Sequence, residues 1–340
     1  MNKVISKDKI ADFLTALMAK YTVVAPMPRH EAPAEFKELQ PGDRPIIDGS
    51  HAMMPPKDYF LPRYEVLLKV EQGKDSVKVE SPIPESKPRV MLGAWLPDLQ
   101  GIQVLDRVFL DKKFTDPYYA ARRENTILVA IMPAKPRWSW FCASLDDVEG
   151  WKKNVDAVMY DLGDRFYVEV ISDKGSEVVE GPFFADPTDA DTAEKNGIWE
   201  SFKTSTSLPV GEAKIYENLS WENPIWAEIA EKCIACGMCS YMCPSCSCFD
   251  IQDETCGNCV ERYRCRDTCQ FEEFTLMGHG YNPRDNQLPR SRQRLLHKFQ
   301  YQHEQFGVVG CTGCGRCVEL CPVNVDIRDV LIRTCAGERE

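Results

Sequence analysis

The stretch at residues 233–244 reads CIACGMCSYMCP, and a second stretch at residues 311–322 reads CTGCGRCVELCP. Both follow the spacing C-x2-C-x2-C-x3-C-P, in which three thiolates wrap one [4Fe–4S] cluster from a single loop and the fourth reaches a neighbouring cluster. Proline suits the last position because it lacks an N–H group and ends the local helix. Structural zinc, the alternative, more often uses separated cysteine pairs. The repeated pattern therefore predicts a pair of [4Fe–4S] clusters.

We call these two stretches the first string and the second string. Because each string sends its last cysteine to the cluster of the other, the ligands divide into two sets of four. The expected ligands of cluster 1 are Cys233, Cys236, Cys239 and Cys321, and those of cluster 2 are Cys311, Cys314, Cys317 and Cys243. A pair of clusters brought together in this way is suited to passing single electrons.

A cysteine-rich insert at residues 244–310 separates the two strings. It carries six further cysteines, which are Cys246, Cys248, Cys256, Cys259, Cys265 and Cys269. A third iron–sulfur cluster would draw on the last four of these residues, or on the first two with a later pair. Structural zinc bound by four of the thiolates is a second interpretation, and buried, inert thiols are a third. The sequence leaves all three open.

Composition favours an intracellular, reducing environment. Fifteen of the sixteen cysteines lie between Cys233 and Cys335, whereas a disulfide scaffold would be short and would spread its bridges through the fold. The first ten residues carry charges where a signal peptide needs an apolar stretch, and no run of about 18 apolar residues predicts a membrane span. The net charge of −11 disfavours nucleic acid as a partner. We therefore expect a cytoplasmic protein.

The chain, at 340 residues, is long enough for about two domains and divides near residue 222. The expected fold class is α+β: an N-terminal α/β domain with a connector (residues 1–222), then a ferredoxin-like double [4Fe–4S] cluster domain (residues 223–340) that contains the insert. Apolar spacing predicts helices at residues 5–21, 98–109, 148–162 and 224–232. Alternation predicts a hairpin at residues 64–81 and strands at residues 89–92, 126–132 and 166–172. The polar stretch at residues 183–224 is expected to be a connector or a poorly packed edge.

The first domain shows no active site in its sequence. It has no Walker loop, no G-x-G-x-x-G, no G-x-S-x-G and no H-E-x-x-H motif. Residues 174–176 read Lys-Gly-Ser, but they lack the preceding glycine of a phosphate loop and are expected to form a turn. Trp138, Trp140 and Phe141 are expected to serve in packing rather than in stacking on a flavin.

A basic run precedes the second string and comprises Arg284, Arg290, Arg292, Arg294 and Lys298. We expect either a solvated face or a counter-charge to the clusters, whose reduced form positive side chains would stabilise. A docking patch for an acidic partner subunit is the sharper possibility.

Several further stretches are similar to one family of iron–sulfur proteins. They are residues 243–250 (CPSCSCFD), 278–284 (GHGYNPR), 292–294 (RQR), 297–299 (HKF), 105–109 (LDRVF), 116–119 (DPYY) and the pair Arg122-Arg123. The chain resembles, over most of its length, the beta subunits of cytoplasmic [NiFe] hydrogenases, including sulfhydrogenase, and the corresponding iron–sulfur subunit of anaerobic sulfite reductase. The resemblance implies a subunit that relays electrons between a flavoprotein and a separate catalytic subunit.

Two features depart from that family. Its Arg-Pro-Cys-Asp motif is replaced at residues 93–98 by GAWLPD, and its second cysteine near Pro133 is absent, which leaves Cys142 alone in the first domain. Whatever those cysteines bind in the family is not expected here. In the insert, the family pattern matches Cys246, Cys248 and Cys269, whereas the other three cysteines are additional.

We therefore expect a non-catalytic, electron-transfer iron–sulfur subunit of a cytoplasmic, anaerobic oxidoreductase complex, of the hydrogenase, sulfite reductase or heterodisulfide-reductase-like kind. Its expected partners are an FAD-containing, NAD(P)H-linked flavoprotein subunit and a metal-bearing catalytic subunit, in a hetero-oligomer. The alternative is a redox enzyme that acts on a sulfur substrate at a third cluster in the insert.

Overall fold

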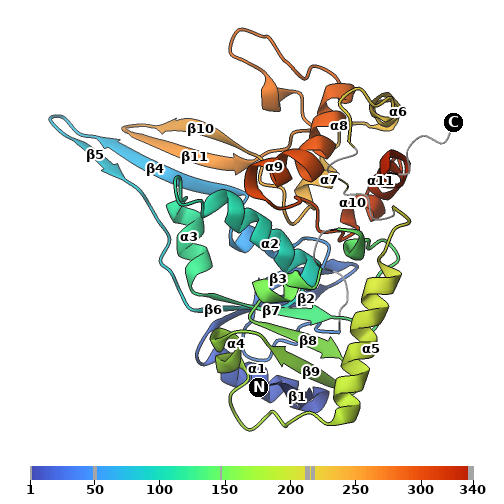
Figure 1. The fold of residues 1–340 in the computed structure, drawn as a ribbon. Helices are drawn as coiled ribbons and strands as arrows, with labels where there is room; N and C mark the ends of the chain where they lie inside the picture. Colours follow the sequence, from blue (N-terminus) through green and yellow to red (C-terminus); the bar gives the residue numbers. More distant parts are fainter. Residues whose placement is uncertain (1, 49–51, 146–147, 211–214, 216–218, 336–340) are drawn as a thin grey trace.

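The computed structural model describes residues 2–48, 52–145, 148–210, 215 and 219–335, except for the side chain of Cys256. Figure 1 shows a β-sheet with its helices in the lower part of the molecule and a mainly helical, cysteine-rich part above it. The expected mixture of helix and sheet is confirmed, because both types of element are present throughout the first half and in the second. None of the described helices is long and apolar enough to cross a membrane.

A seven-stranded sheet forms the centre of the first half. Its strands occur in the order β1-β9-β8-β7-β6-β2-β3. Their bounds are β1 Lys3–Ser6, β2 Thr22–Arg29, β3 Ala32–Glu38, β6 Arg89–Trp95, β7 Thr126–Met132, β8 Ala157–Asp161 and β9 Arg165–Val170. The four strands β2, β6, β7 and β8 run parallel, and the others pair antiparallel at the edges. All seven residues of β7 are buried, as expected for a parallel strand with both faces covered.

Five helices of the first half accompany this sheet. They are α1 Ile10–Met18, α2 Leu96–Phe109, α3 Pro117–Glu124, α4 Asp173–Val178 and α5 Asp189–Ser205. Helix α2 follows β6 directly and packs against β6 and β7. Its other side faces the cysteine-rich half, where Gly101 lies so close to Pro244 that an added Cβ would come within 2.5 Å of the proline Cβ. Short 3₁₀ turns lie at Lys7–Lys9, Pro56–Tyr59, Cys142–Ser144 and Gly150–Asn154.

Three expectations about local structure are wrong. The helix predicted at residues 148–162 is a 3₁₀ turn followed by β8, whose five residues are all buried, so that an apolar run was mistaken for a helical face. The supposed connector contains α5, which begins at a capping box between Thr188 and Asp191 and buries Ile198, Trp199 and Phe202. Residues 174–176 belong to α4 rather than to a turn.

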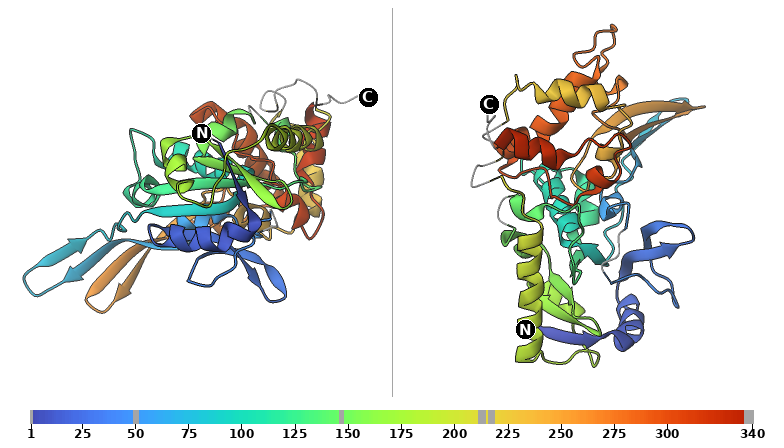
Figure 2. Two further views of the ribbon diagram at one scale, coloured as in Figure 1. Left: turned by 90° about the horizontal axis from the view of Figure 1, so that it is seen from below. Right: turned by 90° about the vertical axis from the view of Figure 1, so that its right-hand side faces the viewer.

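A second, four-stranded antiparallel sheet joins the two halves of the chain. It has the order β10-β11-β4-β5, with bounds β4 Tyr64–Gln72, β5 Val77–Glu80, β10 Phe249–Cys256 and β11 Cys259–Arg266. The hairpin predicted at residues 64–81 is confirmed as β4–β5, and β11 of the insert pairs with β4 from Tyr64↔Cys265 to Glu71↔Cys259. Both hairpins project away from the rest of the molecule (Figure 2).

Buried charges fix this junction. Arg264 of β11 is 2% exposed and donates to Glu65 Oε2 of β4 at 2.8 Å and to Asp116 Oδ2, before α3, at 2.5 Å. Arg122 of α3 also pairs with Glu65. Replacing one member of this network would strongly destabilise the fold, because a buried charge would remain unpaired.

The second half consists mainly of short helices around the two strings. They are α6 Ile225–Lys232, α7 Met238–Tyr241, α8 Gln287–Leu296, α9 Gln302–Phe306, α10 Arg316–Glu319 and α11 Ile327–Cys335, with a 3₁₀ turn at Glu273–Thr275. A π-helical turn at His297–Tyr301 connects α8 to α9. The helix predicted at residues 224–232 is confirmed as α6.

Candidate metal centre

The two strings follow the same backbone path. Ala235 and Gly313, the third residue of each string, have φ angles of 54° and 62°. Gly237 and Gly315, the fifth residue, have φ angles of 73° and 75°, and each immediately precedes a short helix, α7 or α10. Two left-handed residues in each string turn the chain tightly around a centre, and glycine adopts this conformation at little cost. The sequence repeat is thus also a structural repeat.

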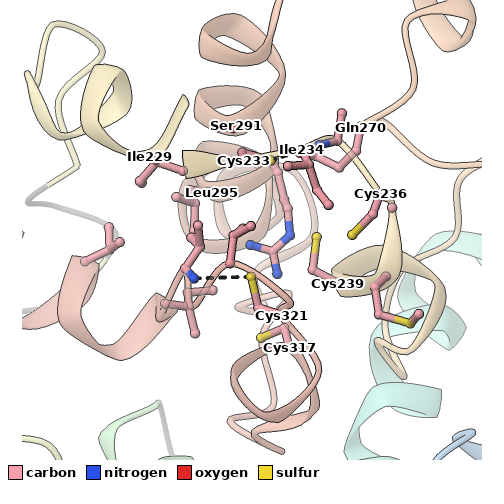
Figure 3. A pocket seen from close by; sticks show the side chains of 18 residues that line it. Ile229, Cys233, Ile234, Cys236, Cys239, Gln270, Ser291, Leu295, Cys317 and Cys321 are labelled. Atoms are coloured by element: carbon pink, nitrogen blue, oxygen red, sulfur yellow. Dashed lines mark hydrogen bonds between the residues drawn. The ribbon is translucent and has the colours of Figure 1, made fainter. Parts of the chain in front are cut away.

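The first string faces a cavity that also receives a cysteine of the second string. Cys233, Cys236, Cys239, Cys317 and Cys321 line it. Figure 3 shows Cys236 and Cys239 of the first string and Cys321 of the second string around one space. All four expected ligands of cluster 1 therefore border one space. Its wall comes from the second half itself, through residues such as Ile229 of α6 and Leu295 of α8, and the neighbouring Ile234 is 59% exposed.

The second string faces another cavity, which lies deeper. Cys243, Cys311, Cys314 and Cys317, the four expected ligands of cluster 2, line it. Cys311 and Cys314 are each only 8% exposed. Cys317 borders both cavities, which places the two sets of thiols next to each other.

Backbone donors already point at several of these sulfur atoms. The N–H groups of Ala235 and Gly313 donate to Cys233 Sγ at 3.4 Å and to Cys311 Sγ at 3.5 Å, at equivalent positions of the two strings. Val325 N–H donates to Cys321 Sγ at 3.2 Å. Donors of this kind stabilise thiolates and tune bound clusters.

Buried cations supplement these backbone donors. Lys298, 4% exposed, donates from Nζ to Cys243 Sγ at 3.1 Å and to Gly310 O at 2.9 Å. A hydrogen bond from Cys246, with Lys298 and Lys57 nearby, holds the pKa of the Cys243 thiol well below its usual range. Arg294 of α8 borders both cavities. Thiol ligands, sulfur-directed N–H groups and buried positive charge together fit an anionic iron–sulfur cluster.

The first half of the chain covers the second string. Arg316, 1% exposed, pairs with Asp98 of α2, its Nη2 lying 2.7 Å from Oδ2, and also donates to the carbonyl oxygens of Ala52 and Met53. Burial raises the pKa of Asp98, although Arg316 opposes that shift. Asp98 ends the stretch that replaces the family motif, but nothing in the sequence pointed to its pairing with Arg316.

A second segment of the first half closes over the same loop. Phe141 N–H donates to Gly313 O at 2.9 Å, and Cys142 Sγ lies 3.3 Å from the same oxygen. Burial raises the pKa of Cys142 well above its usual value, so that this thiol stays protonated. Arg137 donates two hydrogen bonds of 3.0 Å to Glu319 of α10. Trp140 and Phe141 are buried in the core as expected, whereas Trp138 is 67% exposed under the side chain of Arg328.

The structure separates the six cysteines of the insert into two groups. The thiols of Cys248 and Cys269 lie beside each other, and the thiol of Cys246 lies beside that of Cys243. Cys269 also lies near Cys239 of the first string. These three cysteines, the ones that match the family pattern, therefore gather beside the strings.

The other three cysteines of the insert lie along the projecting hairpin. Cys259 and Cys265 are six residues apart on β11, which at ~3.4 Å per residue separates them by about 20 Å. One metal centre cannot use both. Cys256 pairs with Cys259 in the strand register, but its side chain lies outside the described part of the structure. Among the described residues, no group of three or more Cys, His, Asp or Glu side chains is arranged to hold a single metal ion.

Lys57 is a buried cation that sequence reasoning missed. It lies in the 3₁₀ turn Pro56–Tyr59 and donates to Cys246 O at 3.0 Å and Ser240 O at 3.4 Å. Burial, assisted by the nearby Arg266, lowers the pKa of Lys57 to about 8. Nothing in the surrounding sequence distinguishes this lysine from a surface residue.

Comparison with known proteins adds two findings. Residues 232–325 match the family described as 4Fe-4S dicluster domain. The chain is 30% identical over 328 residues to the protein named sulfhydrogenase 2 subunit beta from Pyrococcus furiosus, and the match covers 94% of each chain. No solved structure matches this chain.

Proposed function

Because this chain belongs to the family of sulfhydrogenase beta subunits, as its sequence predicted, we propose that it relays single electrons between a flavoprotein and a metal-bearing catalytic subunit. The dicluster domain identifies an iron–sulfur, electron-transfer subunit of an oxidoreductase, and a relative named as a subunit implies a hetero-oligomeric complex. The finer parts of the proposal are the identity of the two partners, the cytoplasmic location and the ligand sets of the two clusters.

The observation that carries the proposal is the pair of adjoining cavities. Each is lined by the four cysteines expected for one cluster, three from one string and one from the other, and Cys317 borders both. Cys233, Cys236, Cys239 and Cys321 would hold cluster 1, and Cys311, Cys314, Cys317 and Cys243 would hold cluster 2. Each cluster would accept and release one electron, and the protein would supply their spacing, their hydrogen bonds and their charge environment.

The two cavities differ in their access to solvent, which suggests where a partner docks. Cys236 is exposed and Ile234 beside it is 59% exposed, so a partner protein can approach cluster 1 closely. Cluster 2 lies behind residues of the first half. A groove beside Cys311, bordered by Gln100, Trp151 and Asn154, gives a separate approach to it. A relay requires two such approaches.

Anaerobic purification of the native complex, followed by mass spectrometry of the proteins that accompany this chain, tests the proposal. We expect a flavoprotein and a metal-bearing catalytic subunit in fixed ratio, and two [4Fe–4S] clusters in this chain that cycle reversibly in a redox titration. A chain that purifies alone, with an activity of its own, would contradict the relay function.

A second candidate function is supported by the group of Cys246, Cys248 and Cys269. The adjacent thiols of Cys248 and Cys269 lie near Cys239, so a third cluster bound there would sit next to the first string. In that case the chain would itself reduce a sulfur substrate, such as a disulfide or a sulfur oxyanion. Cys248→Ala should then abolish sulfur-dependent activity and lower metal content, while electron paramagnetic resonance still detects two clusters. Unchanged metal content in this variant would leave the two-cluster relay as the function.

A further inference from the structure

Three buried or partly buried cations follow one another along one side of α8 and the π-helical turn after it. Arg290, Arg294 and Lys298 are spaced four residues apart, which places them on one helical face. They belong to the basic run in the sequence. That run is not a solvated face at Arg290 and Lys298, which are 5% and 4% exposed.

The two outer cations have a full set of protein partners. Arg290 donates to the carbonyl oxygens of Asn286, Gln270 and Asp285 at 2.9, 3.2 and 3.0 Å. Lys298 donates to Cys243, to Ser245 and to Gly310, as its three ammonium protons allow. Every side-chain nitrogen atom of these two residues therefore has a protein partner.

The middle cation differs from both. The Nε and Nη2 atoms of Arg294 are buried, and among the described residues neither has a hydrogen-bond partner. A buried guanidinium with unused donors is expensive, because its lost hydration is not replaced. Arg294 is also a residue that lines both cysteine cavities, as Cys317 does. Its unused donors are therefore situated between the two sets of thiols.

We propose that Arg294 is a shared hydrogen-bond donor to both iron–sulfur clusters, and that it raises and couples their reduction potentials. The planar guanidinium presents five N–H groups in a fixed fork, so one side chain can serve acceptors on two sides. Sulfur atoms of an anionic cluster are acceptors, and charge-assisted hydrogen bonds to them stabilise the reduced state more than the oxidised state. Arg294 would affect both clusters because its charge lies between them. This inference rests on the proposed two-cluster relay.

Redox titration of the full-length chain, followed by electron paramagnetic resonance, tests the proposal. Arg294→Met removes the charge and the donors, and Arg294→Lys keeps the charge but removes the fork. Arg292→Met is the matched control, because Arg292 lies on the same helix but stacks on Trp221 at 3.5 Å and lines neither cavity. Iron content and circular dichroism establish that each variant is folded and loaded.

In Arg294→Met we expect both midpoints to move to more negative potentials. At fixed potential the ratio of reduced to oxidised cluster should fall at least about tenfold for each, which is 59 mV for a one-electron couple. Arg294→Lys should give smaller shifts of both in the same direction, and Arg292→Met should leave both unchanged. If Arg294→Met fails to retain iron, the lysine variant decides.

Specific outcomes would overturn the inference. A shift of one midpoint only, wild-type midpoints in Arg294→Met or Arg294→Lys, or loss of iron from one string only would each show that Arg294 is not shared. Failure of the proposed function is distinguishable, because the wild-type chain would then lack two reversible clusters.

Discussion

The cavity of the first string is lined by helices of its own half of the chain, whereas the loop of the second string packs against the N-terminal half. Ile229 and Leu295, from α6 and α8, line the first cavity, and Cys236 remains exposed. Around the second string, Asp98 holds Arg316, and the backbone of Phe141 donates to Gly313. One motif with one backbone path thus occupies two different environments.

This difference teaches that the same spacing of cysteines does not give two clusters the same properties. Burial, hydrogen bonds to sulfur and nearby charge determine the potential of an iron–sulfur cluster, and all three differ between the two cavities. In a relay, two unequal clusters give the electron a preferred direction. The first string is the more exposed of the two, and the second string is reached through the groove beside Cys311.

Removal of a central cysteine from each string should have the largest effects. Cys236→Ala should abolish the signal of cluster 1 and leave cluster 2 largely intact, because Cys236 is exposed and lines only the first cavity. Cys314→Ala should remove cluster 2 and also loosen the junction between the halves, since this loop is buried there. Iron content and electron paramagnetic resonance provide the measurement. Identical spectra for Cys236→Ala and the wild type would show that the ligand set of cluster 1 is wrong.

Breaking the buried pair beneath the second string should come next. Asp98→Ala leaves the guanidinium of Arg316 buried without its carboxylate, which we expect to lower the free energy of unfolding by about 3–5 kcal/mol. Denaturant unfolding, under anaerobic conditions, provides the measurement. Glu228→Ala is the control, because it removes the exposed pair with Arg333 between α6 and α11, and we expect little measurable change. Similar decreases in the free energy of unfolding in the two variants would show that the buried pair beneath the second string contributes no more than the exposed pair.

The left-handed third residue of each string offers a smaller, paired test. Ala235→Gly should stabilise the protein by about 1 kcal/mol, because glycine adopts a φ angle of 54° without the cost of a Cβ. Gly313→Ala should destabilise it by about 1–3 kcal/mol from the backbone alone. Its new Cβ would also lie 2.6 Å from the backbone nitrogen of Cys142. Thermal unfolding would measure the stability of both variants. A change of the same sign in the two variants would contradict the structural repeat.

The rate of iron loss should also differ between the two clusters. When the protein is treated with a chelator under mild oxidation, cluster 1 should disappear before cluster 2, because Cys236 is exposed and the thiols of Cys311 and Cys314 are buried. Electron paramagnetic resonance at successive times would follow the two signals separately. Simultaneous loss would indicate that opening of the whole domain, rather than local access, controls release.

Some of this architecture follows from the sequence because local patterns determine it. The hairpin β4–β5 shows alternating residues around a turn, and α6 shows a helical face, so both were predicted. Strand β8 was mistaken for a helix, because a parallel strand buried on both faces has no alternation to recognise. Helix α5 was missed for the opposite reason, since few apolar residues form its buried stripe, although the capping box at Thr188 was a readable signal.

The sequence likewise predicted the local features of the site but not its long-range contacts. Spacing along the chain predicted the eight cysteines that line the two cavities, because all of them belong to the two strings. It could not tell which residues of the basic run turn inward, since burial of Arg290 and Lys298 depends on how α8 packs. Nor could it show that Asp98 meets Arg316, 218 residues further along the chain. Long-range packing has no signature in a short window of sequence.

The four-stranded sheet pairs a strand that is synthesised early, β4, with a strand that is synthesised late, β11. Strand β4 leaves the ribosome about 200 residues before β11, its partner in the insert, which at ~5–20 residues per second is a wait of roughly 10–40 s. During that time the nascent chain exposes an unpaired strand edge, the kind of surface on which chains aggregate. Iron can be enclosed in the second cavity only later still, after Cys311, Cys314 and Cys317 have been made. Maturation of this subunit is therefore a late event, and a chain interrupted before β11 would present an open edge to its neighbours.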